Sequence, residues 1–362
     1  MQWLFLIILI PYIYLITKIY ISLSEIKPFN RHTEPGTLLS VIVACRNEGK
    51  RLPLILSDIA DQSYNPDLFE LIVVDDNSSD STLEVASEFG RIKNLKVLNS
   101  SGKGKKQAIR TGVEAATGTL IITTDADCRI GKNWLKTIAS FQEEYKPEMI
   151  ICPVKLEGGK GFFQRFQELE FLSLQGITAG TAVSGDPVMC NGAGLAFPRA
   201  EYLRHAGNLH DELASGDDVF LLHNIKMDRG KTIMWLESAE AEAKTRTSDN
   251  LLSFLRQRGR WISKTGAYSD RFTWLLAIVT FVTISAQVLL FVAGLFIPPL
   301  LWIFAAFFIL KSIPDFLVLS NTSERYGKKY LMSWFIPSQL VYPFYVLSII
   351  PCSLLTRAEW KY

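Results

Sequence analysis

Four long apolar segments at the two ends of the chain constrain its fold most strongly. The first begins at the N-terminus, MQWLFLIILIPYIYLITKIYISL, and has roughly the 20 residues that a helix needs to cross a bilayer. Three more lie towards the C-terminus, at residues 272–297, 300–319 and 334–355. These lengths predict an N-terminal transmembrane anchor, residues 1–24, and a C-terminal transmembrane region of about three helices, residues 272–356.

Basic residues beside these segments predict their orientation. A cleaved signal peptide would start with basic residues and end at small ones, and the first segment does neither. Lys18, Lys27 and Arg31 follow its apolar core, which favours an uncleaved anchor whose C-terminal side faces the cytoplasm. The basic loop 325–329 would return to that same side. Because the segment 300–319 contains Pro314 and Asp315, a re-entrant or interfacial helix is an alternative interpretation of it.

Between the apolar ends, residues 37–268 form a polar block whose first half alternates between strand and helix patterns. The apolar runs LLSVIVAC, FELIVVDD, NLKVLNS and GTLIITTDAD are short and rich in β-branched residues, as buried parallel strands are. Helical spacing falls between them, at residues 51–62, 80–90 and 105–117. This alternation predicts an α/β domain with an open, mostly parallel sheet.

Polar and charged residues follow all four predicted strands. They are residues 46–48, 75–77 and 101–106, and then Asp125 and Asp127. Ligands of open α/β sheets bind beyond the carboxyl ends of the strands, so these residues should meet at one edge. Each stretch alone also has an ordinary interpretation as a turn or a helix cap. Together, their acids, basic residues and glycines favour a phosphate-bearing ligand with a divalent cation, Mg²⁺ or Mn²⁺. Strand alternation predicts that both aspartates point towards that site.

The ordered set SVIVACRNE, IVVDDNSSDST, GKGKKQAI, TTDADC, NGAGLAF, SGDD and QRGRW resembles a membrane-bound family 2 glycosyltransferase of the GT-A fold. The resemblance covers residues 40–263 and includes the DxD and QxxRW motifs. With its flanking apolar segments, the chain is similar to the branch that contains polysaccharide synthases and ceramide glucosyltransferase-like enzymes. The resemblance implies that residues 37–268 form a GT-A glycosyltransferase domain with a nucleotide-sugar donor.

The resemblance also implies roles for particular residues. Asp127 would bind the metal, and Asp218 would be the catalytic base. Lys105 would be the lysine of the donor pocket, with Lys103 and Lys106 as neighbouring alternatives. Arg110 stands where the family usually has asparagine. The donor would contact Ala44, Arg46, Glu48, Asp76, Lys105 and Asp125. The acceptor or the diphosphate would contact Asp217, Gln257, Arg260 and Trp261.

These features predict an inverting, metal-dependent glycosyltransferase, with a UDP-sugar as the favoured donor. The acceptor is a membrane lipid or lipid-linked glycan, or alternatively a growing polysaccharide. The small number of spans favours the lipid. A non-catalytic scaffold would be expected to lack a charged site residue, and none is missing. A net charge of +2 argues against a nucleic-acid partner. We expect an integral protein of a bacterial inner membrane with its catalytic domain in the cytoplasm; the oligomeric state stays open.

Overall fold

The computed structural model describes residues 4–30, 34–213 and 216–355, which group into two units. The sheet unit comprises residues 27–157 and 189–246, and the helical unit comprises 4–26, 158–188 and 247–355. The helical unit is therefore assembled from three separate stretches of the chain. Its middle stretch falls inside the range 37–268 that we predicted as one domain.

A seven-stranded sheet with the order β3-β2-β1-β4-β8-β6-β9 forms the centre of the sheet unit. Its strands are β1 (Leu39–Cys45), β2 (Phe69–Asp75), β3 (Leu95–Asn99), β4 (Leu120–Asp125), β6 (Met149–Ile151), β8 (Leu195–Pro198) and β9 (Ile233–Trp235). The first four run parallel to one another, whereas β8 is antiparallel to both β4 and β6. The mostly parallel α/β fold predicted from the sequence is confirmed.

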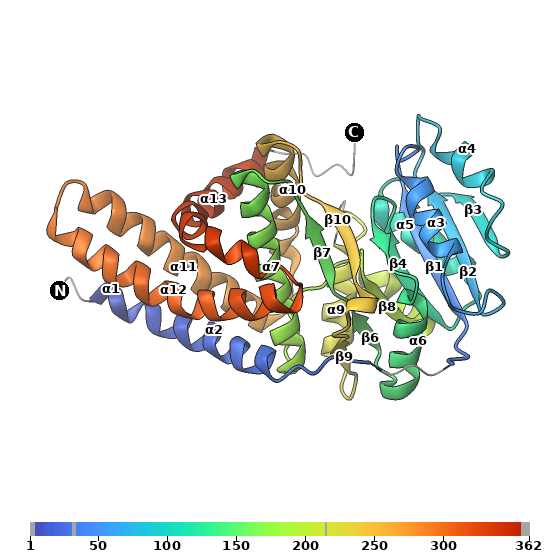
Figure 1. Cartoon of the computed structure of the whole chain (residues 1–362), viewed down its shortest axis with the longest axis horizontal. Helices are drawn as coiled ribbons and strands as arrows, with labels where there is room; N and C mark the ends of the chain where they lie inside the picture. Colours follow the sequence, from blue (N-terminus) through green and yellow to red (C-terminus); the bar gives the residue numbers. More distant parts are fainter. Residues whose placement is uncertain (1–3, 31–33, 214–215, 356–362) are drawn as a thin grey trace. The chain divides into compact units, whose positions relative to one another are not determined.

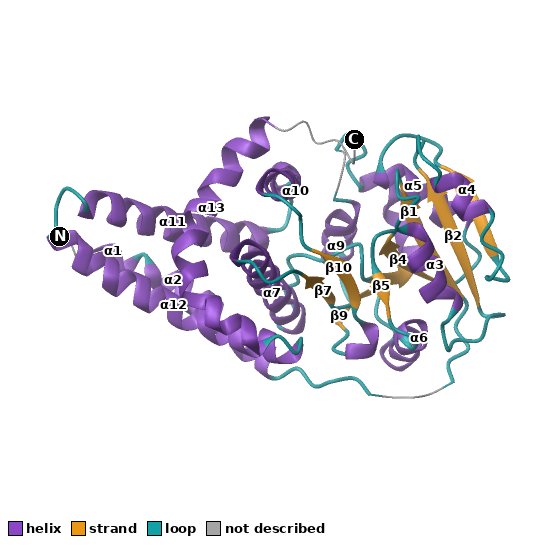
Figure 2. Ribbon diagram, turned by 45° about the horizontal axis from the view of Figure 1, so that its top comes forward, coloured by secondary structure: helices purple, strands orange, loops and turns teal. Residues whose placement is uncertain are grey.

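Smaller elements complete the sheet unit, and all the strands belong to it (Figure 2). A second sheet has the order β5-β10-β7, from β5 (Arg129–Ile130), β10 (Ala243–Arg246) and β7 (Val154–Glu157). The helices are α3 (Leu52–Ala60), α4 (Thr82–Ser87), α5 (Lys105–Ala115), α6 (Trp134–Tyr145), α8 (Arg199–His205) and α9 (Asp217–Met227), with 3₁₀ turns η1 (Ala206–Asn208) and η2 (Ala239–Ala241).

Both faces of the central strands are covered, because every residue of β1 and β2 is buried. The buried residues of β2 include the carboxylate of Glu70. It accepts hydrogen bonds from the Ser40 hydroxyl at 2.6 Å and the Thr117 amide at 2.6 Å, and it pairs with Lys96 at 2.7 Å. Glu70 therefore ties β1, β2, β3 and the turn after α5 together.

The helical unit contains α1 (Leu4–Ile7), α2 (Leu9–Ser24), α7 (Phe162–Val183), α10 (Leu251–Ser263), η3 (Thr265–Ala267), α11 (Arg271–Gly294), α12 (Pro299–Arg325), η4 (Lys329–Trp334) and α13 (Phe335–Leu355). Figure 1 shows α2 lying alongside α12, and α2 also packs against α7. A glycine is required at that second contact, because a Cβ on Gly180 would lie only 2.6 Å from the carbonyl oxygen of Ile19.

Four helices among the described residues are long and apolar enough to cross a membrane, as predicted. They are Phe5–Ser24, Arg271–Gly294, Pro299–Arg325 and Lys329–Cys352. The second C-terminal segment is continuous through Pro314 and reaches Arg325, six residues beyond its predicted end. Asp315 is paired there with Lys311 at 2.7 Å, and it accepts a hydrogen bond from the Tyr12 hydroxyl at 2.6 Å. These contacts offset the cost of a carboxylate among apolar helices.

Candidate active site

The strand register brings the predicted donor residues to one edge of the sheet. Ala44, next to the end of β1, pairs with Val74 of β2 on one side and with Asp125 of β4 on the other. Cys45 pairs with Asp75, so the chain leaves β1, β2 and β4 at nearly the same level. Residues separated by up to 81 positions in the sequence therefore share one rim.

The loops after β1 and β2 are braced against each other. Asn47 and Asn77 both have a positive φ, 55° and 54°, and asparagine tolerates this conformation better than most residues. The Asn47 amide donates to the Ser78 hydroxyl at 2.9 Å. The Glu48 amide donates to Thr82 at 2.7 Å. This bracing fixes the backbone of both loops before any ligand is bound.

Asp76 is fully buried beneath the glycine-rich loop. Its carboxylate accepts the Gly104 amide at 2.9 and 3.0 Å, and it lies 3.5 Å from the guanidinium of Arg46. Glu48 is also buried, with its carboxylate 4.0 Å from Arg51. Asp76 therefore positions the glycine-rich loop and Arg46, in addition to the donor contact predicted for it.

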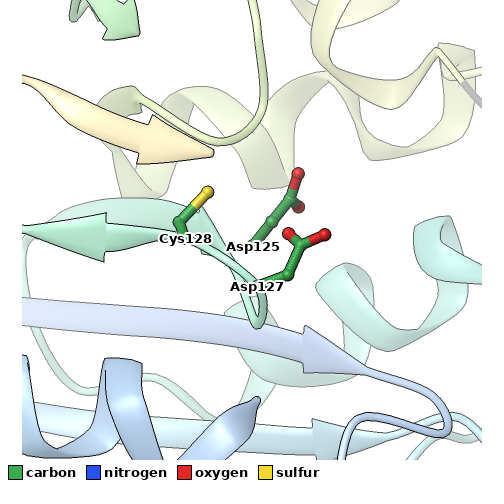
Figure 3. Close-up of side chains that lie close together, drawn as sticks. All are labelled: Asp125, Asp127 and Cys128. Carbon is green, nitrogen blue, oxygen red and sulfur yellow. The ribbon is translucent and has the colours of Figure 1, made fainter. Parts of the chain in front are cut away.

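Asp125 and Asp127 form the acidic centre of the rim (Figure 3). Strand β4 ends at Asp125, so a turn closed by the Cys128 amide on the Asp125 carbonyl at 3.0 Å, not strand alternation, brings the two carboxylates together. Ligand atoms of Asp125, Asp127 and Cys128 all lie within 4.8 Å of one another. Burial, with the nearby Asp125 charge, raises the pKa of Asp127, while Arg51 at 3.7 Å opposes the shift.

These residues fit a hard divalent cation. The two carboxylates supply oxygen ligands, and Mg²⁺ typically takes one or two of these together with phosphate oxygens. Burial, reinforced by both aspartates, raises the pKa of the Cys128 thiol well above its usual value. Sulfur is also a soft ligand, which Mg²⁺ and Mn²⁺ do not favour. We therefore assign the metal-binding capacity to the carboxylates alone.

Lys105, the first residue of α5, pairs with Asp125. Burial alone would lower the pKa of Lys105, but attraction to Asp125, Asp217 and Asp218 outweighs it and raises that pKa above its usual value. Lys106 instead donates to the carbonyls of Leu209 and His210 at 2.7 and 2.6 Å. The geometry thus supports Lys105 over Lys106 as the lysine of the donor pocket.

Arg110, which stands where the related family usually has asparagine, points to the same segment as Lys106. It pairs with Asp211 at 2.7 Å and donates to the carbonyl of Ala206. Lys106 and Arg110 therefore hold residues 206–211 against α5. The departure at Arg110 has a structural explanation within the sheet unit.

Asp217 and Asp218 begin α9, and both are half-buried. Gly216 precedes them with a φ of 100°, a conformation that other residues rarely adopt. One carboxylate oxygen of Asp218 accepts a hydrogen bond from the Gly192 amide at 3.1 Å. The other oxygen accepts one from the amide of the next residue, Val219, at 2.8 Å. A pocket in front of these groups is lined by Lys105, Ile109, Thr123, Gly192, Leu195, Phe197, Tyr202, Asp217, Asp218 and Leu221.

The sheet unit therefore brings together the predicted residues Ala44, Arg46, Glu48, Asp76, Lys105, Asp125, Asp127, Asp217 and Asp218. Gln257, Arg260 and Trp261 lie half-buried on α10, in the helical unit. Arg258, which lies between them, is not among the predicted site residues, although the sequence shows a charged residue one helical turn from both Phe254 and Trp261.

A known protein family matches the part of the chain that carries most of the rim. Residues 40–207, which carry the rim from β1 to α8, match the family model described as glycosyl transferase family 2. The family 2 assignment therefore applies to these residues, which are a little under half of the chain. The resemblance inferred from the motifs is thereby confirmed at the level of the family.

Curated relatives are named as glycosyltransferases. One is the poly(ribitol-phosphate) β-N-acetylglucosaminyltransferase TarS of Staphylococcus aureus, 33% identical over 126 residues, 34% of this chain and 22% of that protein. Another is the β-monoglucosyldiacylglycerol synthase of Trichormus variabilis, 24% identical over 230 residues, 62% of this chain and 48% of that protein. The chain therefore spans less than half the length of these relatives.

A solved structure supports the fold. The mannosyltransferase PcManGT of Pyrobaculum calidifontis, in complex with GDP-Man and Mn²⁺, aligns with a TM-score of 0.60 and 17% identity. The alignment covers 97% of this chain and 96% of that one. At this identity the likeness concerns the fold, and it extends over both the sheet and the helices.

Proposed function

We propose that this chain is an inverting, metal-dependent glycosyltransferase that moves a sugar from a nucleotide-sugar, with a UDP-sugar favoured, to a membrane lipid or lipid-linked glycan. One observation carries the proposal: Lys105 lines the same pocket as the separately held carboxylate of Asp218, and it also pairs with Asp125 of the oxygen-rich metal pair. A non-catalytic scaffold would not need a carboxylate kept apart from the metal ligands.

Donor binding is assigned to the rim of the sheet. Ala44, Arg46, Glu48 and Asp76 surround the proposed nucleoside position, and Lys105 with Asp125 faces the diphosphate and the sugar. Asp127 is the proposed protein ligand of Mg²⁺ or Mn²⁺. When bound, that cation would offset the negative charge that develops on the departing diphosphate. Lys105 contributes a fixed positive charge to the same end.

Proton transfer is assigned to Asp218. Backbone amides donate to both of its oxygens, so its carboxylate stays oriented towards the pocket that it lines. Asp218 takes the hydroxyl proton as the acceptor oxygen attacks the anomeric carbon. The sugar–phosphate bond breaks on the opposite face, so the anomeric configuration inverts. Asp217 and Lys105 are placed to orient the acceptor and the leaving group.

The acceptor is the least constrained part of the proposal. Four helices that could span a membrane are consistent with a lipid acceptor at the cytoplasmic face. A relative named for a glucosyldiacylglycerol product aligns with 62% of the chain, which also favours a lipid. A processive polysaccharide synthase is the second candidate, since another relative is named as a poly-β-1,6-N-acetyl-D-glucosamine synthase. Gln257, Arg260 and Trp261 are proposed to act at the acceptor or diphosphate in either case.

Purified protein in detergent tests the proposal directly. A panel of UDP- and GDP-sugars, with and without Mn²⁺, is incubated with lipid extract or soluble glycan, and nucleotide release is followed. We expect release that depends on the cation, on one donor class and on the lipid fraction. Release that is equally fast after chelation would contradict the assignment of Asp127, and transfer only to soluble glycan would favour the processive candidate.

A further inference from the structure

A buried ion pair lies directly beneath the QxxRW motif of α10. Arg258 on α10 and Glu170 on α7 form two parallel hydrogen bonds, Nε to Oε1 at 2.9 Å and Nη2 to Oε2 at 2.6 Å. Both side chains are almost completely buried. The hydroxyl of Tyr345 on α13 donates to Glu170 at 3.0 Å. Three helices of the helical unit therefore meet at one pair of opposite charges.

The guanidinium of Arg258 also contacts the motif itself. It lies 4.1 Å from the centre of the Trp261 ring and 4.8 Å from that of Phe254, one helical turn away on either side. Its Nη1 donates to the side-chain oxygen of Gln257 at 2.8 Å. Since Glu170 fixes the plane of the guanidinium, it also fixes the surface against which Trp261 rests and the direction of the Gln257 amide.

We propose that Arg258 and Glu170 are positioning residues: the buried pair sets the side-chain orientation of Gln257 and Trp261 for acceptor binding. The proposal rests on the proposed function, because the acceptor role of those two residues does. A purely structural pair would instead hold α7 and α10 together with no specific effect on the acceptor. The helical unit offers a natural comparison, because α7 carries a second buried ion pair, Glu168 with Lys328.

The test is a pair of double-mutant cycles. E170Q and R258K are each combined with W261F, and E168Q is combined with W261F as the matched control. We expect E170Q and R258K to lower kcat/KM for the acceptor about tenfold while the donor KM changes less than about twofold. Adding E170Q to W261F should cause a smaller loss than E170Q causes alone, because one of the two side chains through which Glu170 acts is already gone. E168Q should lower the thermal unfolding midpoint but leave acceptor kinetics within about twofold.

Two kinetic results would overturn the proposal: equal effects of E168Q and E170Q on acceptor kinetics, or effects of E170Q and W261F that simply multiply. R258K retains the charge, so it keeps the question open to measurement if E170Q fails to fold. The fluorescence of Trp261, obtained by subtracting each W261F spectrum, should shift in R258K and not in E168Q. This readout needs no turnover, so an unshifted spectrum refutes the positioning claim, whereas absent turnover in the wild type refutes the proposed function.

Discussion

The substitution Asp218→Asn separates catalysis from folding at the proposed base. The carboxylate accepts two backbone amides, from Gly192 at 3.1 Å and from Val219 at 2.8 Å. An asparagine has the same size but only one acceptor oxygen, so its amide group must face one of these donors. Losing one such hydrogen bond costs about 0.5–1.5 kcal/mol. The fold of the sheet unit should therefore survive the change.

The expected loss of catalysis is larger. A positioned general base contributes about 10²–10⁴-fold, which corresponds to about 2.7–5.5 kcal/mol of the barrier. We expect D218N to bind the donor with an affinity within about threefold of the wild type and to transfer sugar at least about a hundredfold more slowly. Isothermal titration with the donor and nucleotide release in the presence of acceptor measure the two quantities separately.

A control variant lies at the other end of the same helix. Asp228 follows α9, where it pairs with Arg204 and lies 3.2 Å from His205, away from the pocket. D228N should cost a similar amount of stability, about 1 kcal/mol or less for a half-exposed pair, and leave transfer within about twofold. If D218N keeps more than about a tenth of the wild-type rate, Asp218 is not the base. Equal losses in both variants would attribute the effect to folding.

Three further predictions follow from the sheet unit. D127N should raise the Mn²⁺ concentration needed for half-maximal nucleotide release more than about tenfold; an unchanged requirement would place the metal elsewhere. K105M should weaken donor binding more than K106M, because Lys105 pairs with Asp125 of the rim whereas Lys106 donates to the carbonyls of Leu209 and His210. K106M should lower the thermal midpoint more; the reverse order would favour Lys106 as the donor lysine. Burial alone would raise the pKa of Glu70, but its hydrogen bonds with Lys96, Ser40 and Thr117 lower it to about 2. About 2 kcal/mol of stability, allowing for solvent screening, is therefore present above its unfolded pKa near 4.5 and lost as the pH falls towards 2. The difference in unfolding midpoint between wild type and E70Q should be smaller at pH 3 than at pH 6; an equal difference would contradict the assignment.

Sequence patterns predicted the parts of the fold that depend on local regularity. Continuous apolar runs predicted β1, β2 and β4, because a strand buried on both faces needs no alternation. The pattern did not indicate that β8 runs antiparallel between β4 and β6. Its four residues carry no signal of direction, since direction depends on a connection through α7 that only the folded chain reveals.

The candidate site was predictable where one residue type implies one chemistry. The acids at 125, 127 and 218 came directly from their motifs. The motif could not distinguish Lys105 from Lys106, because adjacent helical residues differ only in the direction in which they point. Tertiary contacts decide which of the two lysines faces the acids. Arg258 was missed for a related reason: its partner Glu170 lies 88 positions earlier in the chain.

The three-part construction of the helical unit has a practical consequence for producing the catalytic part alone. A truncated chain covering 27–246 would still contain α7, whose partners α2 and α12 would have been cut away. Fourteen residues of α7 are buried, and many of them would then face water. Such a fragment should aggregate, whereas one in which a short glycine–serine linker replaces residues 158–188 has a better prospect of staying in solution.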